Sequence, residues 1–340
     1  MKDDNIILDV NDLNVRFYQD EGIVKATNGV SYQVNEGKSV GIVGESGCGK
    51  TVSTYAVLNI LPPSGEITEG QINYRKPDGS FIDITELDPD GEEMYKIRGR
   101  QISMIFQEPM TAFSPVHTIY NQIAEAILVH QDISEKEAKE RVVELLGHVG
   151  ISNPSKRLND YPFQFSGGMR QRAMIAMALA SNPRILIADE PTTALDVTIQ
   201  AQVLQLIKEM QDDFNLSLVL ITHDLGVIAH MVDEVYVMYL GQVMESGPVK
   251  GIYHNTKHPY TRDLLLSIPK IQGNEGKIAS IEGSVPDTYS LPSGCPFHTR
   301  CRDYLGDICS KKTPKSVKVA DDHYVSCFKY SGSGVKEECQ

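Results

Sequence analysis

Residues 44–51 read Gly-Glu-Ser-Gly-Cys-Gly-Lys-Thr, which fits the phosphate-loop pattern G-x4-G-K-[ST]. A β-rich run at 39–43 precedes the loop, and a helical pattern from Val52 to Leu61 follows it, so a chance glycine turn is disfavoured. The glycines let backbone N–H groups converge on phosphates at a helix N-terminus, Lys50 adds positive charge, and Thr51 offers its hydroxyl to Mg²⁺. The expected nucleotide-binding residues are therefore Gly44, Glu45, Ser46, Gly47, Cys48, Gly49, Lys50 and Thr51.

The chain around this loop predicts an α/β fold. After Gly167-Gly168 a helix is expected to about Asn182, and the apolar run 184–188 is typical of a buried parallel strand. The polar stretch 64–101 is expected to be an irregular insertion, and 118–150 to form a small helical subdomain. Other expected strands are 6–10, 30–34, 216–222 and 234–239, and other expected helices are 198–212 and 225–231.

Two adjacent carboxylates end the strand expected at 184–188. Asp189 can hold Mg²⁺ through water, and Glu190 can act as general base on an attacking water. The alternative interpretation is solvated charge at the end of a strand.

Upstream, Phe165-Ser166-Gly167-Gly168 opens a helix and forms a second potential anion site. Two phosphate sites beside a single phosphate loop make sense if nucleotide is held between two subunits. At this point the sequence resembles the ATP-binding subunits of ABC transporters.

The resemblance implies roles for further residues. Gln107 matches the Q-loop glutamine that senses Mg²⁺ and the attacking water, and His223 matches the switch histidine that contacts the γ-phosphate. Asp196 resembles the D-loop aspartate, a contact across the dimer. Phe17 matches the aromatic residue that stacks on adenine, with Tyr18 as the alternative. In the signature motif, Ser166, Gly167 and Gly168 are expected to contact the nucleotide of the opposing subunit.

Three segments resemble more narrowly the subunits that energise oligopeptide and dipeptide importers. They are Phe165–Met169, Met104–Thr111 and His258–Arg262. The resemblance implies two transmembrane permease subunits, a second ATP-binding subunit and an extracytoplasmic substrate-binding protein as partners, with Met110 to Ile119 near a permease coupling helix. Sugar and nickel importers remain alternatives for the cargo, and a soluble non-transport ABC ATPase is a more distant one. The dimer partner is either a paralogue, as is usual in this branch, or a second copy.

The predicted architecture is a P-loop NTPase of the ABC type, with a mixed sheet and an α-helical subdomain at about 108–182. This nucleotide-binding domain is expected to span 1–270, and a small Cys-rich extension 271–340.

Charge and hydropathy limit where the protein acts. Its 340 residues carry a formal net charge of −13, which disfavours binding to nucleic acid. The acidic opening does not read as a signal peptide, and the longest apolar runs are far shorter than the ~20 residues of a membrane span. We therefore expect a peripheral protein at the cytoplasmic face of the cell membrane, attached through partners.

Five of the six cysteines lie after residue 294, and four of them form the pattern C-x5-C-x7-C-x17-C. Four thiolates suffice for one zinc ion or one cubane cluster. The resemblance to peptide-importer subunits points to a [4Fe-4S] cluster, with zinc, free thiols or disulfides as alternatives. The expected ligands are Cys295, Cys301, Cys309 and Cys327. Cys339 is left over, and Cys48 is interpreted as a small filler within the phosphate loop.

Overall fold

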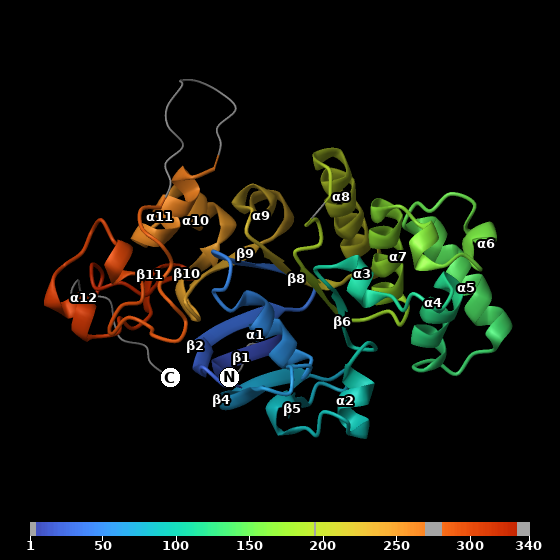
Figure 1. Cartoon of the computed structure of the whole chain (residues 1–340), viewed down its shortest axis with the longest axis horizontal. Coiled ribbons are helices and arrows are strands. Elements are labelled where there is room, and N and C mark those ends of the chain that lie inside the picture. Colours follow the sequence, from blue (N-terminus) through green and yellow to red (C-terminus); the bar gives the residue numbers. More distant parts are fainter. Residues whose placement is uncertain (1–4, 194, 269–280, 332–340) are drawn as a thin grey trace. The chain divides into compact units, whose positions relative to one another are not determined.

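The computed structural model describes residues 5–193, 195–268 and 281–331 (Figure 1). The chain divides into two compact units. The first comprises Met1–Gln33, Ser39–Thr85 and Thr222–Gln340, and the second comprises Val34–Lys38 and Glu86–Ile221. The predicted boundary after residue 270 lies outside the described residues.

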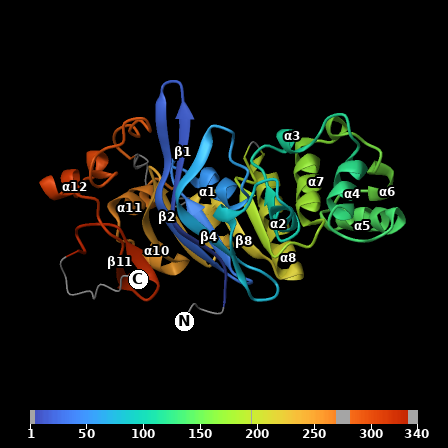
Figure 2. The ribbon, with the colours of Figure 1, turned by 90° about the horizontal axis from the view of Figure 1, so that it is seen from below.

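The first unit contains a four-stranded antiparallel sheet with the order β2-β1-β4-β5. β1 and β2 are the two long blue strands of Figure 2. Buried and exposed residues alternate along the C-terminal half of β2, as in a sheet with one solvated face, whereas β1 is buried over most of its length. The bounds are β1 Ile6–Gln19, β2 Gly22–Asn35, β4 Gly65–Arg75 and β5 Phe81–Asp83.

The same unit contributes five strands in the order β11-β12-β10-β9-β3 to the second sheet. β3 pairs with β9 in parallel, whereas β9, β10, β12 and β11 pair in antiparallel fashion, so this sheet is mixed. The strands are β3 Ser39–Val43, β9 Glu234–Tyr239, β10 Gln242–Pro248, β11 Val317–Ala320 and β12 His323–Val325. The helices are α1 Lys50–Val57, α9 Leu225–Met231, α10 Val249–His254, α11 Pro259–Leu266, α12 Asp307–Lys311 and the 3-10 turn η3 His298–Arg300.

The second unit has three parallel strands in the order β8-β7-β6. Every residue of β7 is buried, as expected for a strand covered on both faces. The bounds are β6 Ile102–Ile105, β7 Ile185–Asp189 and β8 Ser217–Thr222.

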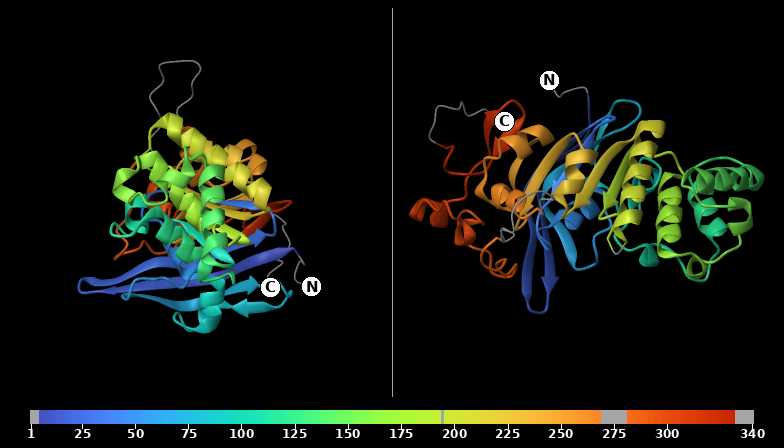
Figure 3. Two further views of the ribbon diagram at one scale, coloured as in Figure 1. Left: turned by 90° about the vertical axis from the view of Figure 1, so that its right-hand side faces the viewer. Right: turned by 90° about the horizontal axis from the view of Figure 1, so that it is seen from above.

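Helices α4, α5 and α7 of the second unit pack on one another, and they lie together as the green helices of both views in Figure 3. The starts of α4 and α5 are set by N-cap side chains. Thr118 caps α4 by accepting a hydrogen bond from the Asn121 N–H at 3.2 Å, and Ser134 forms a capping box with Glu137 at the start of α5. The elements are α2 Glu92–Ile97, α3 Pro109–Ala112, α4 Ile119–Leu128, α5 Glu135–His148, α6 Pro154–Arg157, η2 Pro162–Gln164, α7 Gly167–Leu179 and α8 Val197–Phe214, preceded by η1 Ile84–Glu86.

The structure corrects one sequence prediction and extends two others. The stretch 64–101 is not irregular, because it contains β4, β5 and α2. Most of β4 is partly or fully exposed, so its polar residues gave a weak strand signal. The strands predicted at 6–10 and 30–34 are the ends of a longer hairpin. Within the described ranges, no helix combines the length and the apolar character that crossing a bilayer requires.

Candidate nucleotide site

The phosphate loop of the first unit connects β3 to α1. Gly49 is the N-cap of α1 and has φ = 95°, a left-handed conformation that favours glycine. A Cβ at Gly49 would also lie 2.3 Å from the carbonyl oxygen of Ala26. The loop therefore passes so close to β2 that only glycine fits at this position.

The side chains of the loop divide into buried and exposed groups. Lys50 is buried, and its Nζ donates to the carbonyl oxygens of Gly44 and Glu45 at 2.8 and 3.1 Å. Cys48 is also buried, and burial raises the pKa of its thiol, which agrees with a filler of the loop interior. Ser46 and Gly47 are exposed at the tip. An anion can therefore approach the loop from the side of these two residues.

In the second unit the structure brings Glu190 and Gln107 together. The Gln107 Nε2 donates to Glu190 Oε2 at 3.1 Å, and the Thr193 hydroxyl donates to the same oxygen at 2.9 Å. Glu190 has φ = 43°, which is uncommon for a residue with a side chain, and its N–H donates to the Ile221 carbonyl at 2.9 Å. Strained backbone of this kind clusters at functional sites. Asp189, the last residue of β7, is fully buried.

Two further predicted residues are N-caps of helices in the second unit. The Ser166 hydroxyl accepts a hydrogen bond from the Met169 N–H at 3.3 Å, and Gly167 and Gly168 form the first turn of α7. Ser166 and Gly167 are exposed. Asp196 precedes α8 and is exposed, with no hydrogen bond from its side chain to the helix. Ala194, two residues before Asp196, lies outside the described residues.

His223 and the candidate adenine-stacking residues belong to the first unit. His223 follows β8 directly and is exposed. Phe17 is half-buried, with its ring so close to Gly65 that a Cβ there would lie 2.7 Å from Cε1, whereas Tyr18 is 49% exposed. Both aromatic residues thus stay candidates, with Tyr18 the more accessible of the two.

Two family profiles match the chain. Residues 27–193 match the profile described as "ABC transporter", and residues 244–309 match "Oligopeptide/dipeptide transporter, C-terminal region". The dipeptide transport ATP-binding protein DppD of Bacillus subtilis is 47% identical over 323 residues, which cover 95% of this chain and 94% of DppD. The chain belongs to the ABC transporter ATP-binding family. The oligopeptide transport ATP-binding protein AppD of the same organism is 45% identical, and the match covers 97% of this chain and 99% of AppD.

Solved ABC cassettes share the fold. The dimeric cassette MJ0796, in a post-hydrolysis state bound to ADP and Pi, superimposes with a TM-score of 0.62 at 27% identity, covering 72% of this chain and 99% of MJ0796. CbiO1 of Clostridium perfringens, part of a transporter complex, gives a TM-score of 0.60 at 25% identity over 74% of this chain and 92% of its own. The predicted ABC-type P-loop fold, with its mixed sheet and helices, is confirmed, and the protein is an ABC ATPase.

The iron–sulfur prediction is not supported by the arrangement of the side chains. Across the ranges that the structure describes, no group of three or more His, Cys, Asp or Glu side chains is placed to hold a metal ion. Burial, together with the charges of the neighbouring cysteines, raises the pKa of Cys295 and of Cys301 to about 11 and also raises that of Cys327. The four thiols therefore lie close enough to influence one another electrostatically.

Strand pairing, ring packing and ion pairs stabilise the described residues 281–331. β12 pairs with β10, and Phe297 packs its ring against Tyr239 and Tyr260 at centroid distances of 5.3 and 5.2 Å. Asp303 accepts hydrogen bonds from Arg262 at 3.2 Å and from Lys329 at 2.6 Å. These contacts join residues 281–331 to the rest of the first unit.

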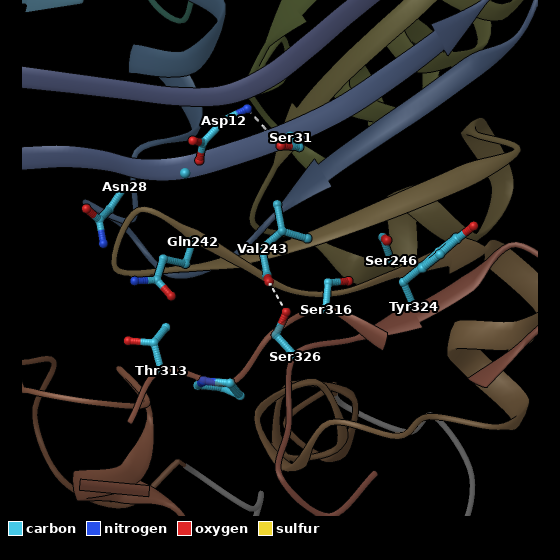
Figure 4. Close-up of a pocket in the computed structure, with 12 residues that line it drawn as sticks. Asp12, Asn28, Ser31, Gln242, Val243, Ser246, Thr313, Ser316, Tyr324 and Ser326 are labelled. Atoms are coloured by element: carbon cyan, nitrogen blue, oxygen red, sulfur yellow. Dashed lines mark hydrogen bonds between the residues drawn. The ribbon is translucent and has the colours of Figure 1, made fainter. Parts of the chain in front are cut away.

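A polar pocket of about 330 Å³ lies where the extension meets β1, β2 and β10 (Figure 4). Ser326 from the extension donates to the Val243 carbonyl at 3.0 Å, and Ser31 accepts from the Asp12 N–H at 2.9 Å. None of the residues that line this pocket belongs to the motifs named above.

Sequence reasoning missed three residues that contact these motifs. Thr193 follows Glu190 by three positions, and the turn that lets it reach the carboxylate depends on the unusual φ of Glu190. Tyr260 lies in the segment that resembles peptide importers, and no local pattern links it to the phosphate loop, yet its hydroxyl accepts a hydrogen bond from the Glu45 N–H at 3.0 Å. Arg300 carried no signal, because its partner Glu45 is 255 residues away.

Proposed function

We propose that this protein is the ATP-hydrolysing subunit of a membrane importer for oligopeptides or dipeptides. The observation that carries the proposal is similarity along nearly the whole chain, C-terminal region included, to proteins named as dipeptide and oligopeptide transport ATP-binding proteins. Membership of the general ABC family accounts for the match over residues 27–193 but not for the match over residues 244–309.

The phosphate loop is the proposed binding site for the ATP phosphates. Its backbone N–H groups at the start of α1 and the Lys50 ammonium supply positive potential. Thr51 and Asp189 would hold Mg²⁺, because hydroxyl and carboxylate oxygens are the ligands that this ion prefers. When bound, Mg²⁺ neutralises phosphate charge. The exposed start of α7, with Ser166, Gly167 and Gly168, is proposed to contact the nucleotide of a partner subunit, and Asp196 to contact that subunit.

Glu190 is the proposed general base. Its carboxylate would accept a proton from the water that attacks the γ-phosphate, while the Gln107 amide and the Thr193 hydroxyl hold one carboxylate oxygen in place. Gln107 is also proposed to sense Mg²⁺ and the attacking water. His223 is proposed to contact the γ-phosphate through its exposed ring, and Phe17 or Tyr18 to stack on adenine.

The proposed assembly follows from the same similarity. Two ATP-binding subunits, this chain and a paralogue, would close on ATP and reopen after hydrolysis, which drives two permease subunits between inward and outward access. An extracytoplasmic binding protein would deliver the peptide. The protein would lie at the cytoplasmic face of the membrane, with an ABC domain over 1–270, its helical subdomain at about 108–182, and an extension from 271.

Reconstitution tests the cargo. The complex purified from membranes should contain a peptide-binding protein, and its ATPase activity in liposomes should rise when that protein is loaded with di- or oligopeptide. Stimulation by a nickel-binding or sugar-binding protein instead would contradict the peptide assignment while leaving the ATPase assignment intact.

The four cysteines carry a separate hypothesis, a [4Fe-4S] cluster bound by Cys295, Cys301, Cys309 and Cys327. Their number and their proximity within the extension support it, although the side chains are not placed around a common centre. Anaerobically purified protein would then contain about four irons per chain and absorb broadly in the visible range. Stoichiometric zinc, or no metal at all, would reject the hypothesis, and no catalytic step depends on the cluster.

A further inference from the structure

An arginine of the C-terminal extension forms a two-pronged ion pair with the phosphate loop. The Arg300 guanidinium donates to Glu45 Oε2 from Nη1 at 2.6 Å and to Glu45 Oε1 from Nη2 at 3.2 Å. Its side chain is only 4% exposed and that of Glu45 is 25% exposed. Pairs with this fork geometry, shielded from water, are stronger than exposed ones.

The surroundings of Arg300 fix the direction of its guanidinium. Nε donates to the Glu282 carbonyl at 3.1 Å, and Nη1 also reaches the Tyr239 hydroxyl at 3.3 Å. Phe297, three residues earlier, is fully buried between Tyr239 and Tyr260. These contacts hold the Arg300 side chain in the orientation that reaches Glu45.

Glu45 is held at its backbone as well as at its side chain. Its N–H donates to the Tyr260 hydroxyl at 3.0 Å, and its carbonyl accepts from Lys50 Nζ at 3.1 Å. Tyr260 comes from α11 and Arg300 from η3, so two segments of the C-terminal part of the chain fix the second residue of the phosphate loop.

This arrangement matters because Glu45 places a negative charge in a loop that would bind phosphates. A carboxylate without a partner there would repel the nucleotide, and the repulsion would grow with phosphate charge. Arg300 neutralises that charge and sets the direction in which the side chain points.

We propose that Arg300 is a positioning residue of the nucleotide site, which makes the C-terminal extension a component of ATP binding rather than a separate appendage. The inference rests on the proposed ATPase function. A plainly structural alternative is that the ion pair only attaches the extension to the cassette, in which case its loss lowers stability but leaves the affinity of the folded protein for nucleotide unchanged.

The test compares nucleotide binding by the full-length wild type with that of Arg300→Gln, Glu45→Gln and the double variant. Arg300→Gln should weaken ATP binding roughly tenfold and ADP binding less, because the exposed carboxylate repels the more highly charged nucleotide more strongly. The double variant, which removes both charges and retains hydrogen-bonding amides, should recover to within about threefold of the wild type. Arg302→Gln is the matched control, since Arg302 lies in the same segment and pairs with the exposed Glu282.

Each outcome has a distinct meaning. If Arg300→Gln binds ATP and ADP as the wild type does, or if the double variant binds no better than Arg300→Gln alone, the proposal is overturned. If Arg300→Gln folds poorly, Glu45→Gln still tests the proposal. Loss of the Glu45 carboxylate must not weaken ATP binding more than ADP binding, and a larger loss for ATP would overturn the proposal. If the wild type itself binds no ATP, the proposed function fails instead.

Discussion

The Gln107 amide donates a hydrogen bond to the Glu190 carboxylate across 3.1 Å, so two residues 83 positions apart in the sequence meet at the end of β7. Thr193 donates to the same carboxylate oxygen at 2.9 Å. A carboxylate held by two donors has a defined direction, as a general base requires.

Glu190→Gln should abolish turnover while sparing ATP binding. The amide matches the carboxylate in shape but cannot accept a proton from water, so kcat should fall by about 10²- to 10⁴-fold. Steady-state phosphate release and equilibrium ATP binding measure the two effects. Glu209→Gln, at an exposed position of α8, is the control. Full activity in Glu190→Gln would show that Glu190 is not the general base.

Thr193→Val should lower kcat by roughly threefold to tenfold and leave KM nearly unchanged, because it removes one hydrogen bond that orients the base and no proposed contact with ATP. Thr193→Ser, which keeps the hydroxyl, should restore most of the rate. An unchanged rate in Thr193→Val, or a larger loss in Thr193→Ser than in Thr193→Val, would show that this hydrogen bond does not orient the base.

Gly49→Ala should destabilise the nucleotide-free protein much more than Gly47→Ala. Both glycines have positive φ, 95° and 78°, but only the Cβ at Gly49 would meet a backbone atom, at 2.3 Å, whereas Gly47 has open space. The Gly47 variant should lose about 1 kcal/mol of unfolding free energy and the Gly49 variant at least about 3 kcal/mol. Denaturant unfolding measures both, and equal losses would contradict the close approach of the loop to β2.

Stability should fall between pH 6.5 and pH 4 because of His258. Burial lowers the pKa of this fully buried histidine to about 4, against a partial opposing effect of the Glu245 carboxylate. Between pH 6.5 and pH 4 the unfolded chain therefore binds a proton on His258 that the folded protein does not. The resulting loss of unfolding free energy is absent above pH 6.5 and approaches about 3 kcal/mol near pH 4.

The matched variants for this pH effect are His258→Gln and His254→Gln. The first should flatten the dependence of the unfolding free energy on pH by about one proton, whereas the second, at an exposed position, should leave it unchanged. An unaltered slope in His258→Gln would assign the pH dependence to other groups.

Sequence patterns predicted features that are local in the chain. The phosphate loop, β7 with its two carboxylates and the helix that starts at Gly167 are contiguous motifs, and the structure places β7 and α7 where the pattern indicates. β4 was missed because its side chains are mostly exposed and polar, so the alternation that marks a strand is faint. The contact of Arg300 with Glu45 depends on how distant segments pack, which no local pattern encodes.

The pairing of β12 with β10 bears on any shortened version of the protein. Glu245 and Ser246 of β10 pair with Val325 and Tyr324, and the fully buried Glu245 also accepts a hydrogen bond from His323 at 2.8 Å. Removing the residues after 280 would leave a bare strand edge and take away the His323 partner of a buried carboxylate, and bare edges recruit strands from other molecules. We therefore expect a truncated chain to aggregate, so its ATPase activity could not be measured reliably. Point substitutions are the informative way to study this region.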